Sequence, residues 1–382
     1  MATPLTLSGQ RFNATYLFDT HGRDATTMAQ ELCVEQTVEF PLELIDRQDL
    51  LEQVVGCVVS TTPVGPEKHE VVISFPMEIV GGELTQLLNV VFGNISFKSG
   101  IRLTGLELPP EMVAAFPGPR FGRTGLRQLL WVPQRPLVAS ALKPMGLSAR
   151  DLAQQATELA LGGIDIIKDD HGLADPVFCP YDERVKRCAE AVAEASAKTG
   201  HRTLYMPNIT AAPRLLRQRA ELAREVGAGG VVVAPGLTGF PVMSELAADD
   251  SLALPILCHP AWLGSHIRTP TTGLSHGLLF GTLMRLAGAD AVIFPCFGGR
   301  FSLTRGECRQ TSLATGAPLG RLRAMFPVPA GGVSVERAPE VVSFYGNDVI
   351  LLIGADLRRG PSGVVDTCRS LMDRIDGRHS EA

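Results

Sequence analysis

The chain has 382 residues, of which 45% are hydrophobic and 20% are charged, so it can bury a large core and has room for two domains. Its formal net charge is −5, and its lysines and arginines form no cluster along the sequence, which argues against binding to nucleic acid or to an anionic membrane surface. Apolar runs are shorter than the ~20 residues of a bilayer span, and residues 1–12 lack a signal-peptide pattern. We therefore expect a cytoplasmic protein whose partner is a small molecule.

Cysteine usage agrees with this expectation. The eight cysteines are scattered and include no CxxC pair, and several of them lie within apolar runs of strand length. This spacing favours reduced thiols in the core over disulfides or a zinc site.

Residues 1–125 predict an N-terminal α+β domain. Strands are expected at RFNATYLFD, GCVVSTT, HEVVISFPM and IRLTGLEL, and helices near ATTMAQELCVEQ and GELTQLLNVVFGNI. The segment PPEMVAAFPGPRFGRTG is rich in proline and glycine, so we expect it to connect this domain to a second domain, residues 126–382.

From about Pro136 onward, apolar runs of strand length alternate with segments of helical period. The segment SARDLAQQATELALGG, for example, has a serine that can cap a helix, an apolar residue every three or four positions, and glycines that end it. Eight such strand-helix units in roughly 245 residues predict a (β/α)8 barrel, because continuous apolar strands indicate a parallel sheet covered on both sides. A doubly wound open sheet is the rival, but its GxGxxG turn is missing. The strands are expected at 137–144, 165–170, 203–210, 230–236, 254–261, 290–297, 326–332 and 348–356.

Catalytic groups of such barrels lie at the carboxyl ends of the strands. Lys143 ends the first predicted strand, Lys168 to His171 end the second, Asn208 ends the third and His259 ends the fifth. Glycines follow the later strands, where backbone N–H groups can approach a phosphate. The glycines concerned are Gly298, Gly299, Gly331, Gly332 and Gly354.

The stretch GGIDIIKDDHG places four ionisable residues directly after an apolar run. Since side chains alternate along a strand, Lys168 and Asp170 should share one side while Asp169 points away, where it can pair with an arginine outside the barrel. Carboxylates can hold a magnesium ion. A protonated lysine has no acceptor, so it becomes a ligand only if carbon dioxide converts it to a carbamate.

Several motifs resemble the large chain of ribulose-bisphosphate carboxylase (RuBisCO), and most closely its RuBisCO-like relatives that do not fix carbon. They are KPMGLS, GGIDIIKDDHG, FGNIS, PGPRFG and the late AGG, in the same order along nearly the whole chain. The resemblance implies an N-terminal α+β (ferredoxin-like) domain on a (β/α)8 barrel. It also implies a head-to-tail homodimer in which Asn94 of one subunit completes the site of the other.

The resemblance also implies the roles of individual residues. Lys168 matches the carbamylated lysine, Asp170 a magnesium-binding carboxylate, and Lys143 a lysine that shuttles protons at the enolised carbon. The third metal ligand of the family, a glutamate, is His171 here, so another divalent metal becomes an alternative to magnesium. His259 is kept from the family pattern, and Asn208, at the end of the third predicted strand, is a further candidate catalytic residue.

Other positions depart from the family pattern. The second lysine of the KPK motif falls at or beside Met145, and the mobile-loop lysine corresponds to Arg300. Pro260 replaces the arginine expected beside His259, so a bisphosphate substrate is not expected. Asp356 follows the phosphate-binding position Gly354 and would repel an anion unless it turns away or meets Arg358 or Arg359. A substrate phosphate is expected at Arg300, Gly331, Gly332 and Gly354.

A metal beside a lysine stabilises an enolate formed from a keto compound. The base of the methionine-salvage enolase aligns with Gly100, although Lys98 lies two residues earlier. Decarboxylation of a 3-oxo sugar-acid phosphate, which needs no base, therefore ranks first. Tautomerisation or isomerisation of a keto-sugar phosphate ranks second, and a non-catalytic sugar-phosphate-binding protein is the third alternative.

Overall fold

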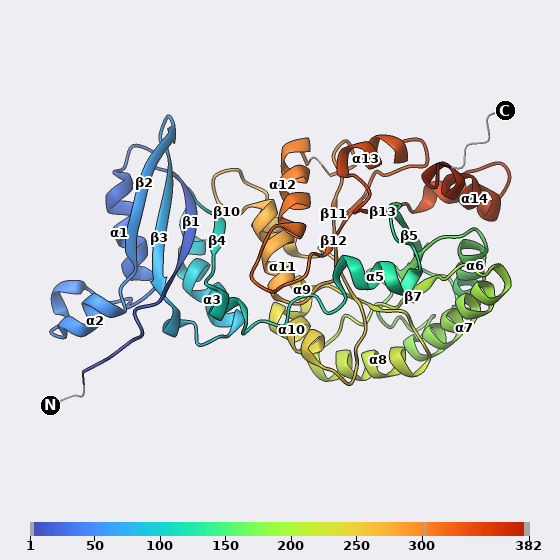
Figure 1. Ribbon diagram of the computed structural model, residues 1–382, viewed down its shortest axis with the longest axis horizontal. Coiled ribbons are helices and arrows are strands. Elements are labelled where there is room, and N and C mark those ends of the chain that lie inside the picture. The colour runs from blue at the N-terminus through green and yellow to red at the C-terminus, as the bar shows by residue number, and fades with distance from the viewer. Residues whose placement is uncertain (1–3, 302, 378–382) are drawn as a thin grey trace.

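The computed structural model describes residues 4–301 and 303–377 and has two parts, an N-terminal sheet domain and a barrel (Figure 1). In the N-terminal domain, strand β1 (Arg11–Asp19) buries every second residue, as expected for a sheet with one covered face. The other elements of this domain are α1 (Ala25–Glu35), η1 (Leu42–Leu44), α2 (Gln48–Gln53), β2 (Cys57–Gly65), β3 (Lys68–Pro76), η2 (Met77–Ile79), α3 (Leu84–Phe92), η3 (Asn94–Phe97), β4 (Ile101–Glu107) and α4 (Pro110–Val113).

The sheet of this domain confirms the ferredoxin-like prediction. Its strand order is β10-β4-β1-β3-β2, and the pairs among β1, β2, β3 and β4 are antiparallel. The sequence did not predict β10 (Gly273–Leu274), which comes from the second half of the chain and pairs in parallel with β4. A strand from the barrel part therefore completes the edge of the N-terminal sheet.

The barrel consists of two four-stranded parallel sheets, β13-β5-β6-β7 and β12-β11-β9-β8. A bridge between Asn208 and Val232 joins β7 to β8, and β12 packs beside β13, so the strands form a ring. The strands are β5 (Leu137–Leu142), β6 (Ile166–Asp169), β7 (Leu204–Met206), β8 (Val231–Val233), β9 (Ile256–Cys258), β11 (Ala291–Pro295), β12 (Phe326–Ala330) and β13 (Ile350–Leu352). Each of them lies within one of the predicted ranges, which confirms the predicted barrel.

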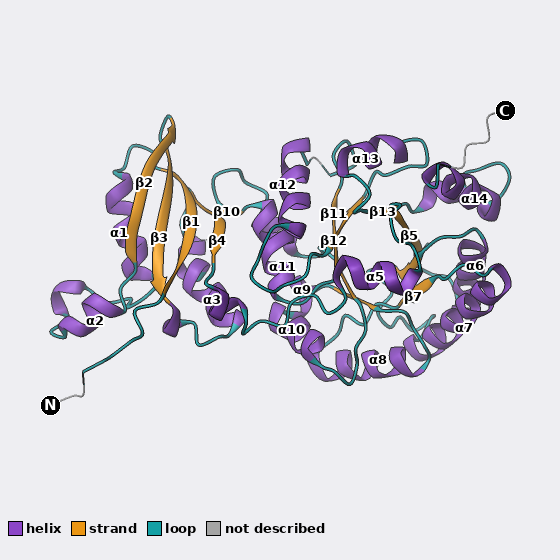
Figure 2. Cartoon of the chain, in the orientation of Figure 1, coloured by secondary structure: helices purple, strands orange, loops and turns teal. Residues whose placement is uncertain are grey.

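Helices surround the ring of strands (Figure 2). Helix α6 (Ala149–Leu161) has the predicted start and end, because Ser148 and Asp151 form a capping box and Gly162 is its C-cap. The other helical segments of this half are α7 (Tyr181–Thr199), α8 (Pro213–Glu225), α9 (Pro235–Thr238), α10 (Phe240–Ala248), η4 (Leu263–His266), the π-helical η5 (Leu278–Leu283), α11 (Met284–Leu286), α12 (Arg305–Gly316), α13 (Ala338–Tyr345), η6 (Ala355–Arg358) and α14 (Val364–Ile375).

Helix α5 (Gly122–Leu130) closes the amino-terminal end of the barrel and lies across the ring in Figure 1. Its Leu126 and Leu130 belong to the same buried cluster as the side chains that fill the barrel interior. The N–H groups of Phe121 and Gly122 donate to Asp290 at 2.7 Å, which anchors the start of the helix. The mouth at the other end is thus the open one, and the boundary predicted between residues 125 and 126 falls within α5.

All eight cysteines are free thiols, and all except Cys57 are buried, as predicted. Within the described residues, no helix is long and apolar enough to cross a membrane.

Asp165, directly before β6, is fully buried and gives the fold a pH dependence. Arg135 donates to its carboxylate at 2.7 and 2.8 Å, and the Val138 N–H at 2.8 Å. Burial opposes ionisation, but the contacts with Arg135, His201 and Val138 outweigh it and lower the pKa of Asp165.

We expect Asp165→Asn to lower the free energy of unfolding by about 1–3 kcal/mol at pH 7, because a hydrogen-bonded carboxylate is lost. A lowered pKa stabilises the fold above the unfolded pKa of about 3.9 and loses this effect as the pH falls through the folded value. Urea unfolding at pH 7 and at successively lower pH should therefore show the difference from wild type shrinking. A difference that grows on acidification would contradict the assignment.

Candidate active site

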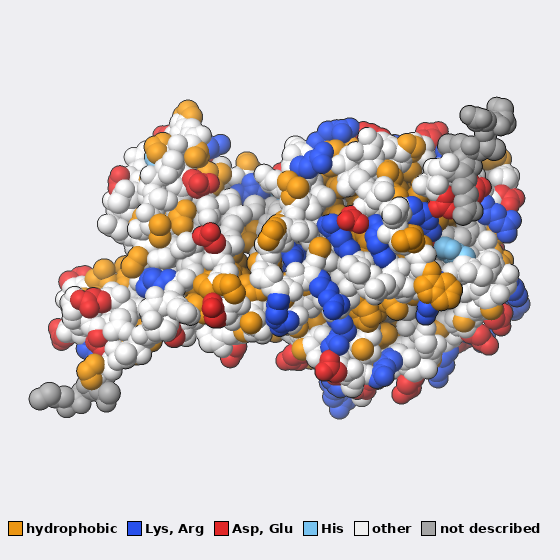
Figure 3. Space-filling view, in the orientation of Figure 1, with side chains coloured by type: hydrophobic (Ala, Val, Ile, Leu, Met, Phe, Trp, Pro, Cys, Tyr) orange, Lys and Arg blue, Asp and Glu red, His pale blue; other side chains and the backbone are white. Residues whose placement is uncertain are grey.

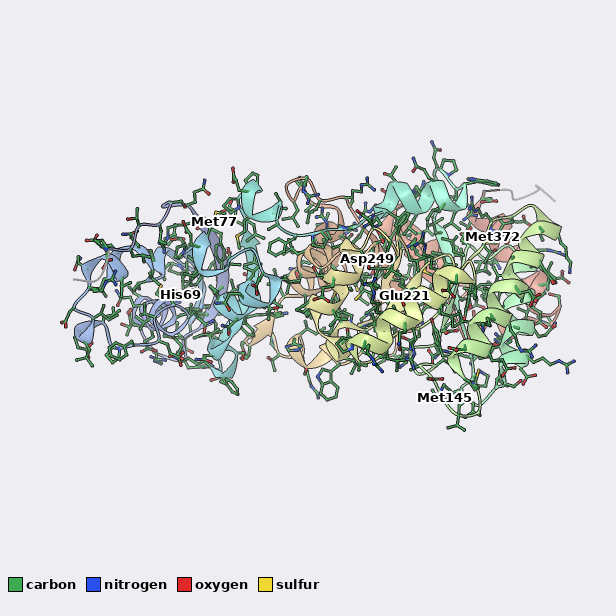
Figure 4. All side chains as sticks on the ribbon, turned by 90° about the horizontal axis from the view of Figure 1, so that it is seen from below. His69, Met77, Met145, Glu221, Asp249 and Met372 are labelled. Carbon is green, nitrogen blue, oxygen red and sulfur yellow. The ribbon has the colours of Figure 1, made fainter. Side chains whose placement is uncertain are left out.

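Polar side chains from three neighbouring strands meet at the open mouth of the barrel. Lys143 follows β5, Lys168 lies within β6 and Asn208 follows β7, and these strands pair in parallel. Figure 4 views the barrel from the side, with Met145 of the loop after β5 at its lower edge, so the mouth faces down in that view. The sequence predicted each of these positions at a strand end.

Lys168 is buried, with 1% of its surface exposed, and its Nζ donates to the backbone oxygen of Asp169 at 2.7 Å. Burial lowers the pKa of its amine to about 8, even though the charges of Asp170 and Asp169 act in the opposite direction. Only a neutral amine can react with carbon dioxide, so this lowered pKa makes a reactive form accessible near neutral pH. The predicted carbamate thus has a suitable amine.

Asp170 is the acidic centre of the mouth. Its Oδ1 lies 2.8 Å from Nζ of Lys143 and 3.2 Å from Nδ1 of His171. Burial would raise the pKa of Asp170, but the contacts with His171, Lys143 and Lys168 outweigh it and hold this pKa well below its usual value. Asp170 is therefore an anion whose neighbours are all potential cations.

His171 and His259 stack face to face, with ring centroids 4.4 Å apart and an interplanar angle of 9°. Nδ1 of His259 accepts the Ala261 N–H at 3.2 Å, so the neutral ring carries its proton on Nε2. Burial, together with the charges of Lys168 and His171, lowers the pKa of His259 to about 2. His259 is thus a neutral hydrogen-bond donor, a suitable group for a developing oxyanion.

Asn208, a predicted catalytic residue, holds the loop of the site in place. Its Nδ2 donates to the backbone oxygen of His171 at 2.8 Å, and its Oδ1 accepts the Thr210 N–H at 3.1 Å. Its own N–H donates to the carboxylate of Asp169 at 3.1 Å. The side chain therefore positions the backbone that carries His171.

Asp169 points away from the mouth, as the strand alternation predicts, and contacts α7. Its carboxylate accepts Nε of Arg184 at 3.0 Å and the hydroxyl of Tyr205 at 2.8 Å. Arg184 is fully buried, and its other nitrogens donate to the backbone oxygens of Leu173, Ala174 and Cys179 in the loop after β6. Sequence reasoning foresaw an arginine partner but did not identify Arg184, although its place early in the helix after β6 was the available signal.

The predicted phosphate loops contact each other directly. Gly332 has φ +154°, and a Cβ there would lie 2.4 Å from Cα of Gly299. The Arg300 N–H donates to the Gly331 oxygen at 2.9 Å. These glycines are thus required by the close approach of two loops, and phosphate binding by Gly331 and Gly332 stays a prediction.

Arg300 and Gly354 are open to a ligand. The exposed guanidinium of Arg300 lies 5.0 Å from the ring centre of Phe301, and a Cβ at Gly354 would meet no atom of the described residues within 4 Å. The carboxylate of Asp356 accepts the Val335 N–H at 2.8 Å. This anion is therefore engaged with the backbone of the neighbouring loop, and its expected repulsion of a phosphate is reduced.

Asn94 does not join the cluster at the mouth of its own chain. Its Nδ2 donates to Glu35 and Glu39 of the N-terminal domain, both at 3.0 Å.

Gly100 has φ +74°, and a Cβ there would lie 2.4 Å from the backbone oxygen of Asp19, so a lysine cannot fit without a backbone shift. Lys98 is 3.6 Å from Glu31.

The residues of the mouth fit a divalent cation only with help from a carbamate. Among the described residues, the one close group of three carboxylate or histidine side chains is Asp19, His21 and Glu67 of the N-terminal domain. The mouth itself offers Asp170 and His171, and Nζ of Lys143 lies 2.8 Å from Oδ1 of Asp170. A carbamate on Lys168 would supply the missing oxygen donor.

Comparison with known families identifies the chain. The family model "Ribulose bisphosphate carboxylase large chain, catalytic domain" matches residues 124–373. The chain belongs to the RuBisCO large-chain family. This RuBisCO family member is 39% identical over 348 residues to RuBisCO-like protein 1 of Rhodopseudomonas palustris, covering 91% of this chain and 93% of that protein.

Two further relatives carry names of activities. A 5-methylthioribulose-1-phosphate isomerase of Rhodospirillum rubrum is 37% identical, covering 97% of each chain. A 2,3-diketo-5-methylthiopentyl-1-phosphate enolase of Geobacillus kaustophilus is 35% identical, covering 80% of this chain and 74% of that protein. The family thus includes relatives of enolase and isomerase type, as the sequence motifs indicated.

Solved structures agree with this family. The RuBisCO-like protein of Rhodopseudomonas palustris superposes with a TM-score of 0.86 at 38% identity, covering 97% of this chain and 99% of that chain. The octameric RuBisCO of Pyrococcus horikoshii gives a TM-score of 0.91 at 26% identity, covering 98% and 89%. The family therefore includes both RuBisCO-like and RuBisCO members with this fold.

Proposed function

We propose that this RuBisCO-like protein is an enzyme that isomerises a phosphorylated keto pentose of the methylthio type through an enolate. The observation that carries this proposal is the contact of Lys143 with Asp170 beside buried Lys168 at the barrel mouth. The relatives named as isomerase and enolase support the substrate class. Among the candidate reactions, we therefore rank isomerisation by proton transfer above decarboxylation, which ranked first from the sequence alone.

In this mechanism the substrate carbonyl oxygen faces His259, whose Nε2–H donates a hydrogen bond as negative charge develops. Lys143, as a neutral amine, takes the proton from the neighbouring carbon and then returns it as an ammonium. Asn208 keeps His171 in place through its backbone oxygen. Lys168 as a carbamate, Asp170 and His171 would hold a divalent cation, Mg²⁺ or a metal that suits imidazole better, which supplies positive charge at the developing oxyanion.

The substrate phosphate is placed beside Arg300, Gly331, Gly332 and Gly354. An exposed guanidinium can donate bidentate hydrogen bonds to a phosphate, and Gly354 leaves space for close approach. Asp356 is engaged with the Val335 N–H, which supports this placement.

The proposed assembly is a head-to-tail homodimer in which Asn94 of a second copy reaches the mouth. Asn94 contacts its own domain here, and Phe97 of the same segment η3 is 93% exposed. An apolar side chain this exposed is suited to an interface. Oligomeric relatives such as the octameric RuBisCO of Pyrococcus horikoshii support an assembly of several chains.

Incubation with 5-methylthioribulose 1-phosphate in D2O tests the proposed reaction. We expect deuterium beside the carbonyl carbon and an isomeric keto phosphate in the NMR spectrum, with no release of carbon dioxide. Lys143→Met should lose the exchange, whereas Lys198→Met, at an exposed position of α7, should keep it.

Decarboxylation is the second candidate, favoured by the tight packing at Gly100 that excludes a lysine there. Carbon dioxide released from a 3-oxo sugar-acid phosphate, without exchange into the keto phosphate, would favour this candidate over isomerisation. If the protein shows neither turnover nor exchange, but a sugar phosphate raises its melting temperature, the result would favour a binding protein.

A further inference from the structure

A cavity lies at the end of the barrel opposite the mouth. It has a volume of about 390 Å³ and is lined by the interdomain segment Pro117–Arg120, by Ala247 and Ala248 at the end of α10, and by Arg321–Arg323. The last two of these segments precede β9 and β12, so they lie at the amino-terminal ends of the strands. Nothing in the proposed reaction uses this cavity.

Close backbone packing builds the walls of the cavity. Gly118 has φ +64°, and a Cβ there would lie 2.4 Å from Cδ2 of Leu322. A Cβ at Gly288 would lie 2.2 Å from Cβ of Ala247. The PGPRFG motif therefore fixes Arg120 next to two loops that are distant in sequence.

The lining is strongly basic. Arg120, Arg321 and Arg323 line the cavity, and none of the described residues that line it is acidic. Arg120 pairs with Asp250 at 2.7 Å, but the side chain of Asp250 is 92% exposed and thus largely screened by water. Within the described residues, neither Arg321 nor Arg323 forms an ion pair with a carboxylate.

The buried guanidinium of Arg285 adds positive charge behind the cavity wall. Arg285 is 2% exposed and donates to the backbone oxygens of Leu322 and Arg323, directly behind the cavity wall. Burial and the charge of nearby Arg123 lower the pKa of Arg285 to about 10, so it stays charged at neutral pH. No carboxylate among the described residues is paired with it.

Arg321 and Arg323 keep donors available for a ligand, whereas Nε and Nη2 of Arg120 donate to the backbone oxygen of Ala247. Within the described part of the chain, Arg321 donates from Nη2 to the backbone oxygens of Ala114 and Phe116. Arg323 donates from Nη1 to the backbone oxygen of Arg120. These bonds hold the side chains in place and leave the other N–H groups of each fork free to bind an anion.

We propose that this cavity binds a small, multiply charged anion of the pyrophosphate or phosphate-ester class. Arginine forks match phosphate oxygens in geometry and charge, and the volume lies in the range of about 300–1,000 Å³ typical of small-molecule sites. Figure 3 shows Lys and Arg side chains gathered on the barrel face that carries α5 in Figure 1. The site is separate from the mouth, so its ligand is not the substrate in its reactive position.

Ala248 allows a test that leaves every arginine intact. It is the last residue of α10, is exposed and lines the cavity, and Figure 4 places its neighbour Asp249 away from Met145 at the mouth. Ala248→Glu puts a carboxylate among the guanidiniums, and Ala248→Gln has almost the same shape without the charge. Circular dichroism melting of both variants checks that the fold is kept.

Calorimetric titration of the full-length protein with pyrophosphate, in a metal-free buffer of low ionic strength, gives the readout. We expect Ala248→Glu to weaken binding at least about tenfold, and Ala248→Gln to stay within about twofold of wild type, because one like charge opposes the anion. Equal titration curves for wild type and Ala248→Glu would place any binding elsewhere and overturn the proposal. No binding to wild type would overturn it as well. Inorganic phosphate and a sugar phosphate, titrated in parallel, distinguish a free anion from a phosphate ester.

Discussion

Replacement of Lys168 by alanine is expected to lower kcat/KM by at least about 100-fold, because the charge that stabilises the oxyanion is lost. Without Lys168, the mouth keeps Asp170 and His171 as donors and cannot form a carbamate. The measurement is turnover of the keto phosphate with saturating bicarbonate and a divalent metal. Lys186→Ala, at an exposed position of α7, is the matched control and should retain wild-type activity.

The wild-type protein provides a second readout of the same prediction. Its activity should require both bicarbonate and a divalent metal, and the carbamate should be visible in the 13C NMR spectrum after addition of labelled bicarbonate. Full turnover by a metal-stripped preparation free of carbon dioxide would refute the assigned role of Lys168.

Replacement of Arg184 by methionine is expected to cause the largest loss of stability, about 3–5 kcal/mol in the free energy of unfolding, because it leaves a buried carboxylate unpaired. Arg184 and Asp169 are both fully buried and 3.0 Å apart, and Arg184 also holds the loop after β6 through three backbone oxygens. Urea unfolding followed by circular dichroism measures the change.

Two further variants separate the ion pair from the loop contacts. Arg187→Met removes an exposed partner of Glu183 on the same helix and should cost less than about 1 kcal/mol. The double variant Asp169→Asn with Arg184→Met removes the unpaired charge and should recover part of the loss. A double variant no more stable than Arg184→Met alone would show that the lost loop contacts, rather than the unpaired charge, cause the loss of stability.

The barrel strands were predictable because their pattern is local. Val231–Val233 and Ile350–Leu352, for example, lie inside apolar runs that the sequence displays directly. The side chains at their carboxyl ends, such as Lys143 and Lys168, follow from strand order alone. The sequence could not predict β10, whose two residues pair only because β4 lies beside them.

Details of the site were harder to predict, because they depend on pairs of residues from separate elements. Asn208 was predicted as a catalytic residue, yet its amide is engaged with the backbone of His171 and Thr210. The stack of His171 on His259 joins the ends of β6 and β9, and no spacing in the sequence indicates it. Asn94 contacts Glu35 and Glu39 of its own domain, so the role proposed for it requires a second chain.

The shared edge between β4 and β10 also constrains how the protein is made. During synthesis, residues 101–107 leave the ribosome long before residues 273 and 274, so the N-terminal sheet waits with an open edge until much of the barrel exists. Open edges are templates for strand exchange between neighbouring nascent chains. The N-terminal half therefore depends on the second half to cover its sheet edge. An N-terminal half produced alone by truncation is expected to be prone to aggregation.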